Sequence, residues 1–346
     1  MAIDWSDIYS KRVKDAFREA LSDKQLSDDE VVEVLRTVLS DGDLTGTEVN
    51  DLQKIAHAAA TIPPRGKFLL LNLAKEVLDH LSYGQINFST SRQQYAVEIL
   101  CDFLKRKGPQ SFPHLDRSRV GVDLLLRVAN PNIINQRQAG VCGPVAFLYG
   151  LAFDSPAAYA RMGIDLFENG RAKVGRMDVS PGSDCRNYSP PDPLSHGEWV
   201  TAGSLRDSEN LFLDYDDVDK NRAGGTGADE VAHWFEKAGY TDVHYDHNRF
   251  YSMTESDVEK INGYYNNGYR MALSINAKLL DAKTQAESSS KSNHLVVLRS
   301  PIQLEPTAKM TIYTWGNVMF QIPQGGPLTK SQLLEHLYGW VAAKPF

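Results

Sequence analysis

The sequence contains little cysteine: only Cys101, Cys142 and Cys185 occur among its 346 residues. Their spacings fit neither a paired disulfide framework nor a Cys-x-x-Cys metal site. His233, His244 and His247 also lack Cys or carboxylate neighbours at metal-ligand spacing, so no zinc site is expected. We therefore expect no disulfide, no metal and no cofactor, and a reducing working compartment.

Long apolar runs and clustered charge are missing as well. No segment approaches ~20 consecutive apolar residues, and the N-terminus "MAIDWSDIYSKRVKDAF" has no basic stretch followed by an apolar core. The net charge is -7, and the basic residues are scattered. Membrane spans, Sec-type export and nucleic-acid partners are therefore not expected. The chain is expected in the cytoplasm, or in a target cell after secretion without a Sec signal.

A chain of this length predicts two compact domains. From residue 1 to 107 the apolar residues recur at helical spacing, as in Val31, Val34 and Leu35, which predicts a helical bundle. Gly108 and Pro109 then break the periodicity, so residues 108–130 are expected to be a boundary or linker. Residues 131–346 are expected to form the second domain.

The stretch "SDGDLTGTE", residues 40–48, resembles the second half of an EF-hand loop. The first two ligand positions would fall on Thr37 and Leu39, which are poor calcium ligands or none. A turn in which Thr45 or Thr47 caps the next helix is the favoured interpretation. The pattern also resembles the Asp-Gly turn of tellurite-resistance-type helical domains. A calcium sensor in the helical half is the weaker alternative.

The second half predicts an α+β domain, because helices come first and strands follow. One helix is expected after Cys142, and another in "TGADEVAHWFEKAGY", with Thr226 as its cap and Gly239 at its end. Strands are expected in "RMALSIN", "NHLVVLR", "KMTIYTW" and "NVMFQIP". The polar middle, residues 178–225, is expected to be a long functional loop, in which His196 and Arg206 would line the substrate cleft.

Cys142 lies where a helix is expected to begin, and a helix N-terminus lowers the pKa of a thiol. Gly140 and Gly143 would permit a close approach of substrate to this turn. Attack on a carbonyl also needs a base and donors for the oxyanion. His294, at the start of a predicted strand, can be the base, while Gln136 and the Cys142 amide can be the donors.

These features resemble the papain-like (clan CA) cysteine hydrolases: an oxyanion glutamine six positions before a cysteine that opens a helix, then a histidine beginning a strand, then Trp-Gly in "YTWGN". The resemblance covers residues 131–346 and implies a papain-like fold in which Trp315 shields the histidine. The Asn or Asp expected two positions before the tryptophan is Tyr313 here. Thr314 or Asn317 would then orient His294.

The resemblance leaves several functions open. A protease acting on a protein or peptide is favoured because proteolysis is the commonest activity of these families. Glutamine deamidation, amidase action and transglutamination share the same first step. A non-catalytic binding protein that kept the fold is the alternative favoured by Tyr313. With its fused helical half, the chain looks more like a bacterial effector or toxin than like a lysosomal-type enzyme. An immunity or adaptor protein is then expected as a partner. Cys101 is expected in the core, and Cys185 on the surface.

Overall fold

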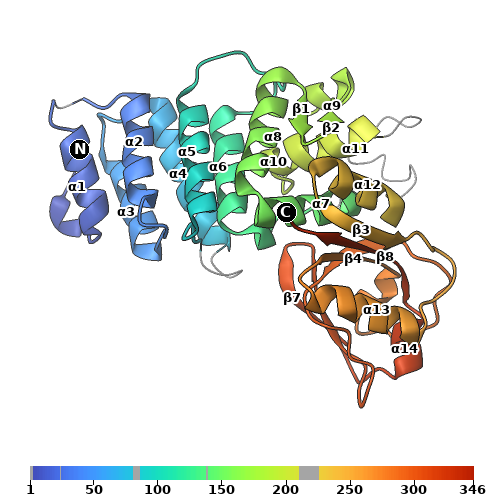
Figure 1. The fold of residues 1–346 in the computed structure, drawn as a ribbon. Coiled ribbons are helices and arrows are strands. Elements are labelled where there is room, and N and C mark those ends of the chain that lie inside the picture. The colour runs from blue at the N-terminus through green and yellow to red at the C-terminus, as the bar shows by residue number, and fades with distance from the viewer. Residues whose placement is uncertain (1–2, 24, 81–85, 138, 210–225) are drawn as a thin grey trace. The chain divides into compact units, whose positions relative to one another are not determined.

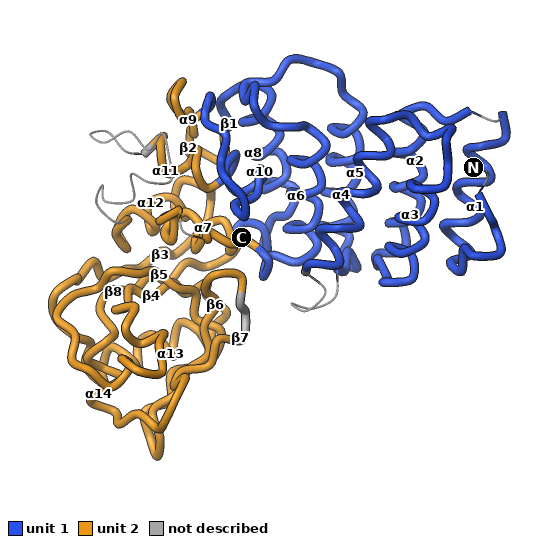
Figure 2. The backbone as a smooth tube through the Cα atoms, turned by 180° about the vertical axis from the view of Figure 1, so that it is seen from behind, with its two compact units in different colours: residues 1–133, 151–172, 186–201 blue, residues 134–150, 173–185, 202–346 orange. Residues whose placement is uncertain are grey.

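The computed structural model (Figure 1) describes residues 3–23, 25–80, 86–137, 139–209 and 226–346. The chain forms two compact units, each assembled from separate stretches of sequence (Figure 2). Unit 1 comprises residues 1–133, 151–172 and 186–201, and unit 2 comprises residues 134–150, 173–185 and 202–346. A helical N-terminal region precedes an antiparallel six-stranded sheet with helices, so the expected α+β class is confirmed.

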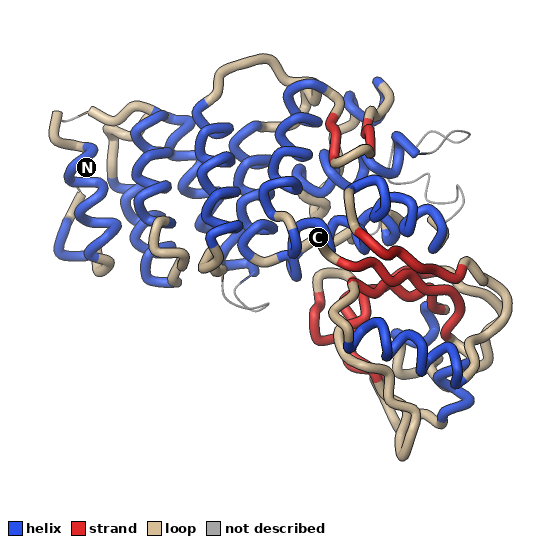
Figure 3. The backbone as a smooth tube through the Cα atoms, viewed as in Figure 1, coloured by secondary structure: helices blue, strands red, loops and turns tan. Residues whose placement is uncertain are grey.

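Helices build unit 1 and run alongside one another (Figure 3). Its elements up to residue 169 are η1 (Trp5–Asp7), α1 (Lys11–Ala20), α2 (Asp28–Leu39), α3 (Gly46–Ala58), α4 (Pro64–His80), α5 (Ser91–Lys105), α6 (Arg117–Ala129), η3 (Pro131–Ile133) and α8 (Pro156–Asn169). Thr45 caps α3 as expected: its side chain accepts from the Glu48 amide, and Glu48 accepts from the Thr45 amide at 3.0 Å. The two groups complete a capping box, which satisfies amides that the first helical turn leaves unpaired.

The predicted boundary segment holds a helix instead of a linker. Gly108 and Pro109 do interrupt the chain, because α5 ends at Lys105, but α6 then forms over residues 117–129. Every side chain of α6 except Arg119 is buried, including those of Arg117, Asp123 and Arg127, so these charged residues do not mark a solvent-exposed face. Within unit 1, Arg127 of α6 pairs with Glu198 at 2.6 Å, which compensates two buried charges.

Unit 2 is built on one antiparallel sheet with strand order β3-β8-β4-β5-β6-β7. The bounds are β3 (Thr241–Asp246), β4 (Arg270–Ile275), β5 (His294–Leu298), β6 (Met310–Thr314), β7 (Asn317–Ile322) and β8 (Leu337–Lys344). The four predicted strands are therefore confirmed as β4 to β7, and β3 and β8 were not predicted. Strand β8 lies inside the sheet, and nearly all its residues are buried, so its sequence does not alternate.

Helices cover both faces of this sheet, and α12 and α13 lie on opposite faces (Figures 1 and 3). The predicted helices are α7 (Cys142–Asp154) and α12 (Ala228–Ala238), whose Phe147 and Phe235 rings meet at 5.2 Å. The other helical elements are α13 (Glu255–Asn266), η6 (Ala277–Leu280) and α14 (Lys330–Leu334). Val258 and Ile261 of α13 join the strands in one apolar core.

The polar middle contains more regular structure than expected. It holds β2 (Met177–Val179), which pairs with β1 (Ala172–Val174), and the short helices α9 (Ser183–Asn187), α10 (His196–Glu198), η4 (Trp199–Gly203) and α11 (Ser204–Glu209). The remainder of the predicted loop, residues 210–225, lies outside the described residues. The prediction of a surface Cys185 was wrong, because its side chain is fully buried, whereas Cys101 is in the core as expected. No helix within the described ranges has the length and apolarity to cross a bilayer.

Candidate active site

Five of the predicted site residues line one small cavity in unit 2. The cavity has a volume of about 10 Å³, roughly the room that one water molecule needs. Its walls come from the segment before α7, the first turns of α7, strand β5 and the end of β6. The predicted residues in its lining are Gln136, Cys142, His294, Thr314 and Trp315.

Cys142 is the first residue of α7 and is half-buried. Burial raises the pKa of its thiol, and the amides of Leu295 and Gly143 and the charge of Arg206 oppose this without cancelling it. Leu295 directly follows His294, so the thiol lies beside the start of β5. The resting cysteine is therefore a neutral thiol near neutral pH, although its neighbours favour the thiolate.

His294 begins β5, and its ring is buried. Its Nε2 lies 2.8 Å from Thr314 Oγ1. The ring of Trp315 stacks on the imidazole with centroids 5.3 Å apart and an interplanar angle of 28°. Burial lowers the pKa of His294 to about 4. The imidazole is thus neutral at physiological pH, oriented by a hydroxyl and covered by an indole.

Tyr313 stands where the resemblance expects an Asn or Asp that contacts the histidine, but its hydrogen-bond partner is a backbone carbonyl. Its hydroxyl donates to the carbonyl of Ile134, and its ring stacks on Tyr149 with centroids 4.2 Å apart. Thr314 is therefore the residue of this pair that contacts His294. Asn317, the other predicted orienting residue, begins β7, and its side chain lies outside the described part of the chain.

Gln136 is buried, and its Oε1 has no hydrogen-bond partner among the described residues. The neighbouring turn contains Arg137 at φ +50°, a left-handed conformation that is uncommon outside glycine. Gly140 in the same segment has φ +64°, so its backbone favours glycine. The side chain of Asn135 spans this turn, and sequence reasoning did not single it out.

Gly143 is packed closely against Thr226, and its predicted contact with substrate stays a prediction. A Cβ at this position would lie 2.3 Å from Thr226 Cγ2. Thr226 was expected to cap α12, but Gly227 is the N-cap, and Thr226 Oγ1 accepts from Arg206 Nη1 at 2.8 Å. Arg206, expected in the substrate cleft, is buried on α11, where its charge favours the Cys142 thiolate. The predicted end of α12 is confirmed, since Gly239 has φ +104°.

His196 is not among the residues that line the cavity beside Cys142. It belongs to α10 in unit 1, and its Nδ1 is buried without a described hydrogen-bond partner. No group of three or more His, Cys, Asp or Glu side chains is arranged to hold a metal ion within the ranges that the structure describes. His244 contacts Asp242 at 2.8 Å, and its ring stacks on Tyr264.

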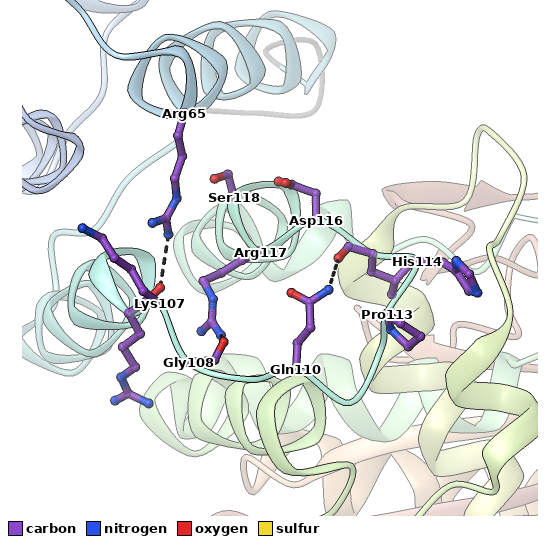
Figure 4. Close-up of a pocket in the computed structure, with 11 residues that line it drawn as sticks. Arg65, Lys107, Gly108, Gln110, Pro113, His114, Asp116, Arg117 and Ser118 are labelled. Atoms are coloured by element: carbon purple, nitrogen blue, oxygen red, sulfur yellow. Dashed lines mark hydrogen bonds between the residues drawn. The ribbon is translucent and has the colours of Figure 1, made fainter.

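A second cavity, of about 490 Å³, lies in unit 1 and is lined by Arg65 and the segment from 106 to 118 (Figure 4). Arg65 donates to the carbonyl of Leu104 at 2.6 Å. Arg117 donates to the carbonyl of Gly108 and pairs with Glu168. The two guanidinium groups thus hydrogen-bond to backbone carbonyls at the end of α5 and in the segment that follows it. No predicted site residue lines this cavity.

Comparisons of the chain with protein-family models, with curated proteins and with solved structures gave no match.

Proposed function

We propose that the chain is a papain-like cysteine hydrolase that cleaves amide bonds, with a protein or peptide as substrate. One observation carries the proposal: Gln136, Cys142, His294, Thr314 and Trp315 line the same cavity, although up to 179 positions separate them in the sequence. The order and residue types of Gln136, Cys142, His294 and Trp315 are those that the papain-like resemblance implies. Thr314 takes the orienting role that Tyr313 leaves open.

In the proposed reaction the neutral thiol of Cys142 is the nucleophile. In the proposed tautomer, the Nε2–H group of His294 donates a hydrogen bond to Thr314 Oγ1, which leaves Nδ1 unprotonated to act as the base. Nδ1 takes the thiol proton as sulfur bonds to the substrate carbonyl carbon, and the Gln136 carboxamide and the Cys142 amide stabilise the oxyanion. The carbon–nitrogen bond then breaks, the amine leaves with the proton from His294, and water hydrolyses the thioester.

The resting pair is uncharged in this proposal, because burial raises the pKa of Cys142 and lowers that of His294. Proton transfer then occurs when a substrate carbonyl is in place, as in serine hydrolases. A simple alkylating agent should consequently react slowly, whereas an electrophile that mimics a peptide carbonyl should react faster. Glutamine deamidation and amidase action use the same groups, and they differ from proteolysis in the amine that leaves.

A non-catalytic binding protein is the second candidate. It is favoured by the small volume of the cavity and by the neutral states of Cys142 and His294. Against it, a decayed site has no need for a buried glutamine beside the thiol. The proposal also includes action as a bacterial effector or toxin held in check by an immunity or adaptor protein. Growth arrest on expression that requires Cys142 would support that part.

The test is intact-mass spectrometry after brief exposure, at mildly acidic pH, to a peptidyl acyloxymethyl ketone, whose carbonyl mimics that of a peptide. The wild type is compared with Cys142→Ala and His294→Ala. Cys101 and Cys185 serve as internal references, because both are fully buried and label only when the chain unfolds. One adduct on Cys142 that disappears without His294 is expected. Equal and slow labelling of wild type and His294→Ala would refute the hydrolase and leave the binding protein.

A further inference from the structure

Asn135 lies beside the proposed oxyanion donor and makes two contacts that join separate parts of the site. Its Oδ1 accepts from the amide of Arg137 at 2.8 Å, so the side chain bridges over Gln136. Its Nδ2 donates to the carbonyl of Trp315 at 2.6 Å, 180 positions along the chain. A single buried carboxamide therefore connects the turn that contains Gln136 with the turn that covers His294.

Both turns have backbone conformations that need such support. Arg137 and Trp315 each have φ +50°, and this left-handed region is unfavourable for residues other than glycine. Gly316, at φ +73°, completes the second turn, where a Cβ would lie 2.8 Å from Asn135 Nδ2. The close approach of Asn135 to this turn thus requires both the carboxamide and a glycine.

A second contact runs parallel to the first one. The hydroxyl of Tyr313 donates to the carbonyl of Ile134, the residue before Asn135. Two hydrogen bonds thereby join the two segments: Ile134 with Tyr313, and Asn135 with Trp315. Because Thr314 and Trp315 lie in the second segment and both contact the ring of His294, the position of the base follows the position of this junction.

We infer that Asn135 is a positioning residue that fixes Gln136 and the Trp315 cover of His294 relative to each other; its catalytic consequence rests on the proposed hydrolase function. Asn135 does not line the cavity that holds Cys142 and His294. Its role is to hold the oxyanion donor and the base in one geometry, and errors of about 1 Å in such geometry reduce rates on the order of a hundredfold. An asparagine suits the role because one carboxamide both donates and accepts.

The test compares Asn135→Ser and Asn135→Ala with a matched control, Asn262→Ser. A serine at position 135 can still accept from the amide two residues on, but it is too short to reach Trp315. Asn262 of α13 likewise donates to one carbonyl and accepts from one amide, both of Ile302, at 2.8 and 2.7 Å. Asn262→Ser therefore reproduces the loss of packing and hydrogen bonding away from the proposed site.

Two measurements are made on the full chain. Acrylamide quenching reports the exposure of Trp315, with Trp315→Phe identifying its share of the fluorescence. Hydrolysis of p-nitrophenyl acetate gives kcat and KM. Trp315 is 41% exposed in the wild type, and both Asn135 variants should raise its quenching above this starting level. They should also lower kcat about tenfold or more with KM unchanged. Asn135→Ser provides the result if Asn135→Ala fails to fold.

Two results would overturn the inference: quenching that matches the wild type in both Asn135 variants, or a fall in kcat that Asn262→Ser reproduces. Failure of the proposed function looks different. In that case wild type and Cys142→Ala hydrolyse the ester at the same rate, while the quenching still decides whether Asn135 holds the Trp315 turn.

Discussion

Burial of a neutral histidine at the proposed site makes the stability of the protein depend on pH. The pKa of His294 falls from 6.5 to about 4 on folding, because burial penalises the charged ring. The unfolded state therefore binds more protons between these values, so stability rises with pH through this window. The pKa difference is about 2.5, and each pKa unit is worth about 1.4 kcal/mol, so His294 contributes roughly 3 kcal/mol to the change in unfolding free energy across this window.

The measurement is urea unfolding at pH 7.5, 5.5 and 4 for the wild type and for His294→Gln. Glutamine keeps a polar group near Thr314 and does not titrate, so the variant lacks the contribution of His294 while other groups titrate in both proteins. One of these is buried Asp123, whose pKa burial raises to about 7, with the opposite effect on stability. The wild type should lose about 3 kcal/mol more than His294→Gln between pH 7.5 and 4. Equal losses in the two proteins would refute the buried neutral state of His294.

Three further predictions concern packing and ligands. Gly143→Ala should destabilise the chain by about 1–3 kcal/mol, because its Cβ would overlap Thr226. Gly263→Ala, in an open helical position, should stabilise it by about 0.5–1 kcal/mol. Thermal unfolding is measured for both variants, and a change of melting temperature in the same direction in both would contradict the prediction. Arg117→Met should cost about 1.5–3 kcal/mol in urea unfolding, because Glu168 loses one hydrogen-bonded cation and keeps Arg106 as its partner; a loss below about 0.5 kcal/mol would argue against a stabilising role. Calcium should leave the melting temperature unchanged, since residues 40–48 form a capped helix start; a rise of the midpoint with calcium would restore the sensor hypothesis.

The elements that sequence reasoning located are those with a periodic pattern or a clear end. Strands β4 to β7 carry β-branched and apolar runs, and α12 ends at a glycine in the left-handed conformation. Helix α6 and strand β8 were not predicted, for different reasons. All residues of β8 except Lys344 are buried, so its sequence lacks the alternation between polar and apolar positions on which such predictions depend. Helix α6 follows closely on Gly108 and Pro109, and its residues Arg117, Asp123 and Arg127 are buried in ion pairs that spacing along the chain does not show.

At the candidate site, spacing along the chain predicted Gln136, Cys142 and His294, which line one cavity. Each has a characteristic residue type and lies at the start of an element or just before one. Contacts between distant segments could not be predicted in this way. Asn135 bonds to a carbonyl 180 residues away, and Thr226 meets Gly143 and Arg206 only in the folded chain. The position of Asn135, two residues before a left-handed residue, is a local signal for its bond to the Arg137 amide. It is no signal for the bond to the carbonyl of Trp315.

The use of Thr314 instead of residue 313 has a physical reason in the register of β6. The pairing of β6 with β7 is irregular between Ile312 and Thr314, and such bulges change the direction of side chains at the end of a strand. Tyr313 then bonds to Ile134, and Thr314 meets His294. The hydroxyl of Thr314 orients the ring as a carboxamide would. Unlike the carboxylate of an aspartate, it carries no charge that could stabilise an imidazolium. The lowered pKa of His294 follows from burial without a charged partner, so in the proposed reaction proton transfer must be driven by the developing bond to substrate.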